Sequence, residues 1–165
     1  MELWGRSEAL ATLDGLLRDT ATGGRVGLVA GEAGIGRSAL VRAFAARGSA
    51  RARFLWGLCD PLVTPRASGP LHDIGQQAGG VLAARLAARA DRQEVLAALV
   101  HELSGLPQRQ RRVVVIEDAH WADEATLDTI VLLGRRIERL RALLLVTYRD
   151  DGSARTTHCT GRWRC

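Results

Sequence analysis

The chain has 165 residues, of which 47% are hydrophobic and 25% are charged, and its formal net charge at pH 7 is +5. This length and composition fit one globular domain with its own core and exclude a disordered chain. No apolar run approaches the ~18 residues of a membrane-spanning helix, and the N-terminus lacks the pattern of a signal peptide, so we expect a cytoplasmic protein with no membrane partner.

The apolar residues predict a regular alternation of strands and helices. In chain order we expect a helix over 8–18, a strand over 26–30, a helix from 38 to about 46, a strand over 53–56, two or three helices within 71–104, a strand over 112–116, a helix over 124–140 and a strand over 143–147. The buried stripe of the helix over 124–140 is expected to consist of Leu127, Ile130, Val131, Leu133 and Ile137.

Strands that alternate with helices predict an α/β fold, with an open, mostly parallel sheet of about four strands and helices on both of its faces. We expect one domain over residues 1–150. Residues 151–165 contain no Leu, Ile or Val, so we expect a disordered tail there.

All 23 basic residues are arginines. A coding bias toward arginine explains this composition, and a nucleic-acid partner is the alternative. No helix-turn-helix, zinc finger or aromatic RNA-binding pattern accompanies the charge, so we expect no direct DNA-binding element in this chain. The three cysteines form no CxxC pair, which is typical of reduced thiols.

The most informative segment is GEAGIGRS, which follows the strand over 26–30 and opens the next helix. It fits the pattern G-x-x-x-x-G-K-[ST] except for one residue, and that pattern cradles phosphates with backbone N–H groups and with the positive end of a helix. An ordinary glycine-rich turn is the alternative interpretation. The candidate nucleotide-binding residues of this segment are Gly31, Glu32, Ala33, Gly34, Ile35, Gly36, Arg37, Ser38 and Ala39.

Arg37 occupies the position of the pattern's lysine. Arginine keeps the positive charge but is larger and planar, so the exchange is not conservative in a tight loop. We expect phosphate binding to survive in weakened form and hydrolysis to suffer more.

Two acids, Glu117 and Asp118, directly follow the apolar strand over 112–116. Ligands of open α/β sheets bind at the carboxyl ends of the strands. A phosphate-binding loop needs one acid there to hold Mg²⁺ together with the Ser38 hydroxyl, and another group to orient the attacking water. We therefore predict Ser38, Glu117 and Asp118 as metal ligands, with two solvated loop acids as the alternative.

The strand over 143–147 ends in Thr147, Tyr148 and Arg149. Arg149 is a candidate sensor of the terminal phosphate, although a solvated arginine is an alternative. Asp123 is expected to cap the helix that begins near residue 124. His120 and Trp121 are expected to pack under the site rather than to act in catalysis.

Several segments together resemble one family. WGRSE at 4–8, GEAGIGRS at 31–38, WGLCDPLVTPRASGPLHDI at 56–74, VVVIEDAHWADEATLD at 113–128 and LLLVTYRDD at 143–151 are similar to the AAA-like, three-layer P-loop ATPase domain of large ATP-binding LuxR-type transcriptional regulators and related signalling NTPases (STAND type). The resemblance covers about residues 2–151.

The resemblance implies ATP and Mg²⁺ as ligands. It places Gly5 and Arg6 near the adenine, assigns Mg²⁺ and water handling to Glu117 and Asp118, and makes Arg149 the sensor arginine. Glu117, Asp118 and Arg149 are thus the candidate catalytic residues. Compared with the family, the chain stops before a fifth strand, a helical lid and a DNA-binding helix-turn-helix, so we expect a truncated or frame-shifted product or a fragment.

Three functions follow as alternatives. The first is an ATP-binding module of a regulatory NTPase with weak or no hydrolysis. The second is a competent Mg²⁺-dependent ATPase, which converts ATP and water to ADP and phosphate. The third is a non-functional fragment or interaction module, whose open sheet edge would favour self-association or a regulatory protein partner.

Overall fold

The computed structural model describes residues 6–61, 67–104 and 110–150, and they form an α/β fold around one parallel sheet. The sheet contains four strands in the order β1-β4-β3-β2, and every neighbouring pair is parallel. The strands are β1 (Arg25–Gly31), β2 (Ala52–Leu58), β3 (Arg111–Glu117) and β4 (Ala142–Arg149). This confirms the predicted fold class and the four predicted strands.

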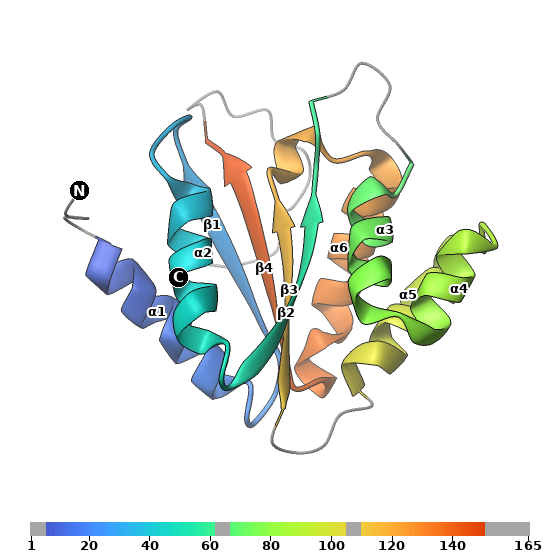
Figure 1. Ribbon diagram of the computed structural model, residues 1–165, viewed down its shortest axis with the longest axis horizontal. Helices are drawn as coiled ribbons and strands as arrows, with labels where there is room; N and C mark the ends of the chain where they lie inside the picture. The colour runs from blue at the N-terminus through green and yellow to red at the C-terminus, as the bar shows by residue number, and fades with distance from the viewer. Residues whose placement is uncertain (1–5, 62–66, 105–109, 151–165) are drawn as a thin grey trace.

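Because the strands are parallel, their carboxyl ends meet at one edge of the sheet, which is the upper edge in Figure 1. The register places Gly31 beside Arg149 and Leu58 beside Glu117. Residues that follow β1, β3 and β4 are thereby brought together although they are far apart in the sequence.

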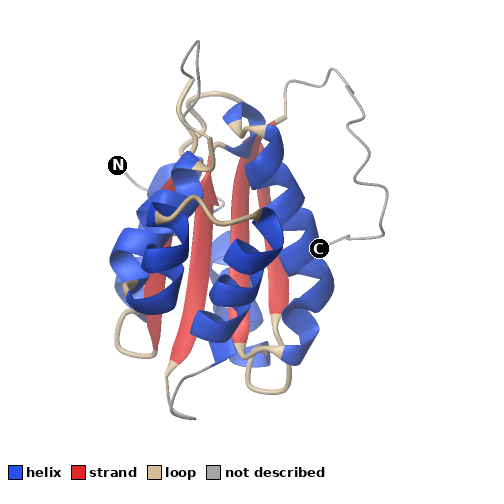
Figure 2. Ribbon diagram, turned by 90° about the vertical axis from the view of Figure 1, so that its right-hand side faces the viewer, coloured by secondary structure: helices blue, strands red, loops and turns tan. Residues whose placement is uncertain are grey.

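Helices cover both faces of the sheet. The described helices are α1 (Arg6–Asp19), α2 (Arg37–Gly48), α3 (Gly69–Ala78), α4 (Gly80–Ala87), α5 (Arg92–Ser104) and α6 (Glu124–Arg136), with short 3₁₀ segments at Ala119–Trp121 (η1) and Ile137–Arg139 (η2). Helices α1 and α2 lie on one face and α3 to α6 on the other (Figure 1), and the view turned by 90° shows the strands lying between the helices (Figure 2). None of the described helices is long and apolar enough to cross a membrane.

The two central strands divide their side chains between two cores. In β3, Val113 and Val115 pack with α1 and α2, whereas Val114 and Ile116 pack with α3 to α6. All four side chains are at most 2% exposed. A strand that is buried on both faces must be apolar at every position, which explains the uninterrupted run of aliphatic residues in the sequence.

The segment over 71–104 forms three helices, and α6 departs from the expected packing. Leu127 and Val131 are each 37% exposed, so the prediction that they belong to the buried stripe is wrong. Thr126 and Thr129 are buried instead, together with Leu133 on the same helix. The hydroxyl of the buried Thr129 donates to the carbonyl of Ala125 within the helix at 2.9 Å.

Candidate functional site at the carboxyl edge of the sheet

The loop from Gly31 to Ser38, called the 31–38 loop below, connects β1 to α2 at the carboxyl edge. Two of its glycines, Gly34 (φ 77°) and Gly36 (φ 92°), have left-handed backbone conformations. An added Cβ at Gly34 would meet no atom within 4 Å, so backbone conformation rather than space selects glycine there. The sequence prediction of a tight glycine-dependent turn between strand and helix is confirmed.

The N-terminus of α2 is open toward this loop. Its N-cap residue is Gly36, which makes no side-chain cap hydrogen bond to the first turn of the helix. The first N–H groups of a helix have no partners within the helix, and its N-terminus carries a partial positive charge. An uncapped N-terminus of this kind is suited to an anion such as a phosphate.

Glu117 is the last residue of β3 and is 6% exposed. Its Oε1 atom is buried and has no hydrogen-bond partner among the described residues. Its Oε2 atom lies 4.0 Å from Nη2 of Arg42, whose side chain is 73% exposed. A buried carboxylate with an unpaired oxygen is unfavourable unless a cation completes its coordination.

Asp118 has a strained backbone that fixes its position. Its φ of 54° lies in the left-handed region, which aspartate tolerates better than most residues. Its backbone N–H donates to Oγ1 of the fully buried Thr147 at 2.9 Å. Thr147, which lies near the end of β4, thereby positions the turn after β3.

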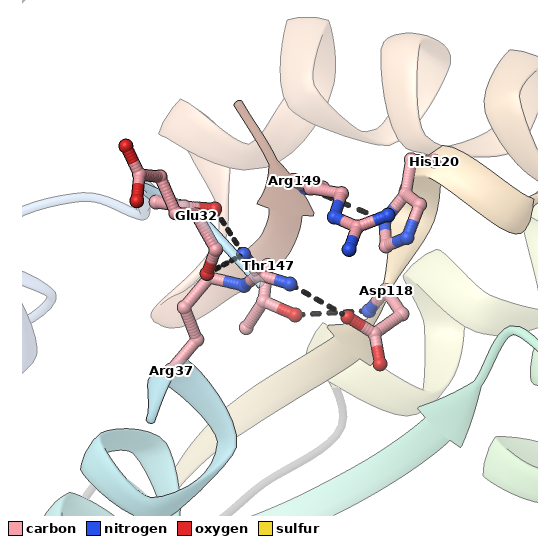
Figure 3. A network of polar contacts seen from close by, with 7 residues as sticks. Glu32, Arg37, Asp118, His120, Thr147 and Arg149 are labelled. Carbon is pink, nitrogen blue, oxygen red and sulfur yellow. Dashed lines mark hydrogen bonds and ion pairs between the residues drawn. The ribbon is translucent and has the colours of Figure 1, made fainter. Parts of the chain in front are cut away.

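Arg37 lies between the two halves of the site (Figure 3). Its Nη1 donates to the carbonyl oxygens of Gly31 and Glu32, and its Nη2 forms an ion pair with Oδ1 of Asp118 at 3.3 Å. The Arg37 side chain is 11% exposed, and its Nε has no partner among the described residues. The guanidinium thus joins the loop after β1 to the turn after β3.

Arg149 lies beside His120, and its backbone N–H donates to the imidazole Nδ1 at 3.3 Å (Figure 3). Trp121 is 45% exposed, so the prediction that it packs under the site is wrong. Asp123 caps α6 as predicted, because its Oδ1 accepts from the N–H of Thr126 at 3.2 Å.

The remaining predicted site residues differ in their burial and in their position in the fold. Ser38 lies in the first turn of α2 and is partly buried, whereas Ala33, Ile35 and Ala39 are exposed. Arg6 begins α1. Gly5 lies outside the described residues, so its predicted place near an adenine stays a prediction.

Several carboxylates at this edge of the sheet act on the thiol of Cys59. Cys59 is buried just after β2, and its N–H donates to the carbonyl of Glu117 at 3.0 Å. Burial, followed by the charges of Asp123, Asp118 and two further aspartates, raises the pKa of the Cys59 thiol from 9.0 to about 12.

The sequence reasoning missed Arg42 as a member of the site. Arg42 follows Ser38 by four residues on α2, and residues at this spacing share one face of a helix. This spacing is the sequence pattern from which Arg42 could have been predicted as part of the site. The contact between Arg37 and Asp118 could not be predicted from residue spacing, because the two are 81 positions apart in the sequence.

A family model described as "AAA ATPase domain" matches residues 2–146. No curated protein sequence matches the chain.

Three solved structures share the fold. C. elegans PCH-2 is 14% identical with a TM-score of 0.53, and the match covers 93% of this chain and 40% of that one. A chain of Drosophila ORC bound to AT-rich DNA and Cdc6 is 12% identical with a TM-score of 0.58, over 89% and 47% of the two chains. A chain of Drosophila ORC bound to DNA is 12% identical with a TM-score of 0.54, over 88% and 77%. This chain thus spans less than half the length of the first two.

Proposed function

The chain belongs to the AAA ATPase domain family, and from this premise we propose that it binds ATP with Mg²⁺ at the carboxyl edge of its sheet, as a regulatory module with weak or no hydrolysis. The observation that carries the proposal is the uncapped N-terminus of α2 at the same edge as a buried carboxylate with an unpaired oxygen. The first feature suits the phosphates, and the second suits the metal that accompanies them.

The phosphates would lie in the 31–38 loop, against the N–H groups at the start of α2. Gly34 and Gly36 hold the backbone in conformations that turn successive N–H groups toward one concave surface. Arg37 supplies the positive charge of the loop. The adenine would lie toward Gly5 and Arg6, as the resemblance to LuxR-type regulators implies.

The donor set fits Mg²⁺. The Ser38 hydroxyl and the Glu117 carboxylate are hard oxygen ligands, and Mg²⁺ in nucleotide sites takes one or two carboxylates, phosphate oxygens and water. No cluster of three or more His, Cys, Asp or Glu side chains occurs among residues 6–61, 67–104 and 110–150, so the protein offers no complete metal cage there. When bound, Mg²⁺ neutralises charge on the β- and γ-phosphates.

Weak hydrolysis is proposed because Arg37 occupies the position of the pattern's lysine and is larger and planar. Asp118 would orient the attacking water, with Arg149 as the sensor of the terminal phosphate. In the structure Asp118 is paired with Arg37 at 3.3 Å. Asp118 would therefore become available to orient water only after Arg37 leaves it.

A regulatory role in a larger LuxR-type protein is supported by the segments at 31–38, 113–128 and 143–151 described above. In such a protein, nucleotide binding would bias the contacts of this module with another regulatory domain or a second copy. Phosphate release measured with the purified chain separates this role from that of a competent ATPase, because rapid turnover that Asp118→Asn abolishes would favour the enzyme.

The experiment that tests nucleotide binding is a titration with a fluorescent ATP analogue, with Mg²⁺ or with EDTA. Ser38→Ala removes the proposed metal-ligand hydroxyl, and Ser49→Ala removes a hydroxyl at the other end of α2 that only donates to the carbonyl of Ala46. We expect saturable binding that Mg²⁺ tightens, with the Mg²⁺ effect lost in Ser38→Ala and kept in Ser49→Ala. Folded protein that binds no analogue under either condition would refute the proposed function.

A further inference from the structure

We infer that Arg37 is an autoinhibitory latch on the nucleotide site, an inference that rests on the proposed function. In the nucleotide-free protein, its guanidinium is held by Asp118 and by the carbonyl oxygens of Gly31 and Glu32. Phosphate binding must draw the guanidinium away from these acceptors. The latch therefore lowers nucleotide affinity, and Asp118 is the residue that sets it.

The guanidinium holds together two separate elements of the carboxyl edge. Gly31 and Glu32 follow β1, Asp118 follows β3, and β4 lies between these strands. Figure 3 shows the Arg37 side chain crossing this interval with its two terminal nitrogens directed to the two sides. The planar guanidinium can make these contacts together because its donors point in fixed, divergent directions.

Asp118 cannot follow the guanidinium if it moves. Its backbone is held in a left-handed conformation at φ 54°, and its N–H is bonded to a threonine hydroxyl that is fully buried. Arg37, by contrast, has a long side chain at the start of α2 and can change rotamer. Opening the latch is therefore a movement of Arg37 alone.

The ion pair with Asp118 balances the positive charge of Arg37 that would otherwise attract the phosphates. An ion pair in which the side chains are 11% and 32% exposed is shielded from water, so it is stronger than a pair on the surface. Of the five N–H donors of the guanidinium, two on Nη1 and one on Nη2 are engaged, which leaves one on Nη2 and the buried Nε donor, which has no partner among the described residues. The other donors become available only when the acceptors of the latch are displaced.

A lysine in place of Arg37 would form a weaker latch. Its ammonium is a compact point charge and cannot spread its donors over the same interval with fixed geometry. Arg37 therefore lowers the nucleotide affinity of this loop in two ways, by its size and by the strength with which it binds acceptors of the protein itself.

The test is a double-mutant cycle on the affinity for the fluorescent ATP analogue. It compares the natural chain with Asp118→Asn, Arg37→Gln and the double variant, each checked for folding by circular dichroism. Asparagine tolerates the left-handed conformation of position 118, so the fold is preserved. Asp60→Asn serves as a charge control, because Asp60 is exposed just after β2 at the same edge.

We expect Asp118→Asn to tighten binding about fivefold to tenfold in the natural chain, by removing a charged hydrogen-bond acceptor of Arg37. The same substitution should tighten binding by about twofold or less in the Arg37→Gln background, where only repulsion between Asp118 and the phosphates is relieved. Asp60→Asn should change the affinity by about twofold or less, because its exposed charge is screened.

Equal gains from Asp118→Asn in both backgrounds, with binding intact, would overturn the latch and leave the proposed function standing. Weaker binding after Asp118→Asn would also overturn it. Four folded proteins that all fail to bind the analogue would overturn the proposed function, and the latch with it.

Discussion

Replacing Glu117 by glutamine should raise the stability of the nucleotide-free protein while it removes the benefit of Mg²⁺. Glu117 is 6% exposed, and its Oε1 has no partner among the described residues. A buried group that is left without its hydrogen bonds costs about 1–3 kcal/mol. The amide of glutamine is uncharged and has nearly the same shape, so the part of this penalty that comes from burying a charge disappears in the variant.

Glu117→Gln removes only a weak ion pair. The other oxygen of Glu117 lies 4.0 Å from a nitrogen of Arg42, whose side chain is 73% exposed, and such a pair contributes about 0–1 kcal/mol. We therefore expect Glu117→Gln to increase the free energy of unfolding by about 1–2 kcal/mol. For a chain of this length, that gain raises the melting temperature by roughly 2–8 °C.

Equilibrium unfolding in urea at pH 7 with EDTA measures the effect directly. Glu102→Gln is the matched control, because Glu102 accepts from Nη2 of Arg112 at 2.6 Å and its loss leaves that arginine unpaired. The two identical substitutions should shift stability in opposite directions. Destabilisation by Glu117→Gln would show that the carboxylate is satisfied in the folded protein and would refute the reasoning. A fluorescent ATP analogue should bind the variant with the same affinity in Mg²⁺ and in EDTA.

Three further predictions concern the rest of the fold. Glu102→Gln should destabilise the protein by about 2–3 kcal/mol in urea unfolding, because it leaves the charge of Arg112 buried without its partner. Adding Arg112→Met should restore most of the lost stability, because Arg112 is 5% exposed and its burial lowers its pKa. In a variant whose other two cysteines are replaced by serine, Cys59 should react slowly with a thiol reagent at pH 8, and fast labelling without denaturant would contradict this. Cys59 should also lower the stability of the protein as the pH rises above about 9, because only the thiol of the unfolded chain ionises there while the pKa of the folded thiol is about 12. Gly57→Ala should destabilise the protein by about 1–3 kcal/mol, because the new Cβ would lie 2.5 Å from the carbonyl oxygen of Pro70, and unchanged urea unfolding would contradict it.

The fold was predictable because its two central strands, β3 and β4, are buried on both faces. The run over 113–116 has no polar residue, and such a run in a chain with alternating helices indicates a central strand of a parallel sheet. The orientation of α6 was less predictable. Its apolar residues surround more than half of the helix, so periodicity alone did not show that Leu127 and Val131 face outward while two threonines face inward.

The position of the site was predictable from topology, whereas its internal contacts were not. Strand ends follow from the sequence pattern, and parallel strands bring those ends together, so Glu117 and Asp118 were expected beside the 31–38 loop. The pairing of Arg37 with Asp118 depends on a long side chain and on the φ of 54° at Asp118. Neither the rotamer nor the backbone angle has a signature in local sequence, because both are set by tertiary packing.

Burial and incomplete hydrogen bonding do not by themselves indicate function, as the two ends of β3 demonstrate. Arg112 near the amino end has two buried nitrogens without partners among the described residues, yet its charge is balanced by Glu102 at 2.6 Å. Glu117 at the carboxyl end has one such oxygen, and among the described residues the cation that pairs with its other oxygen is Arg42 at 4.0 Å. Ligands of parallel sheets bind at carboxyl ends, next to the N-termini of helices. The same defect is therefore structural at one end of the strand and, at the other, a site that a bound cation would complete.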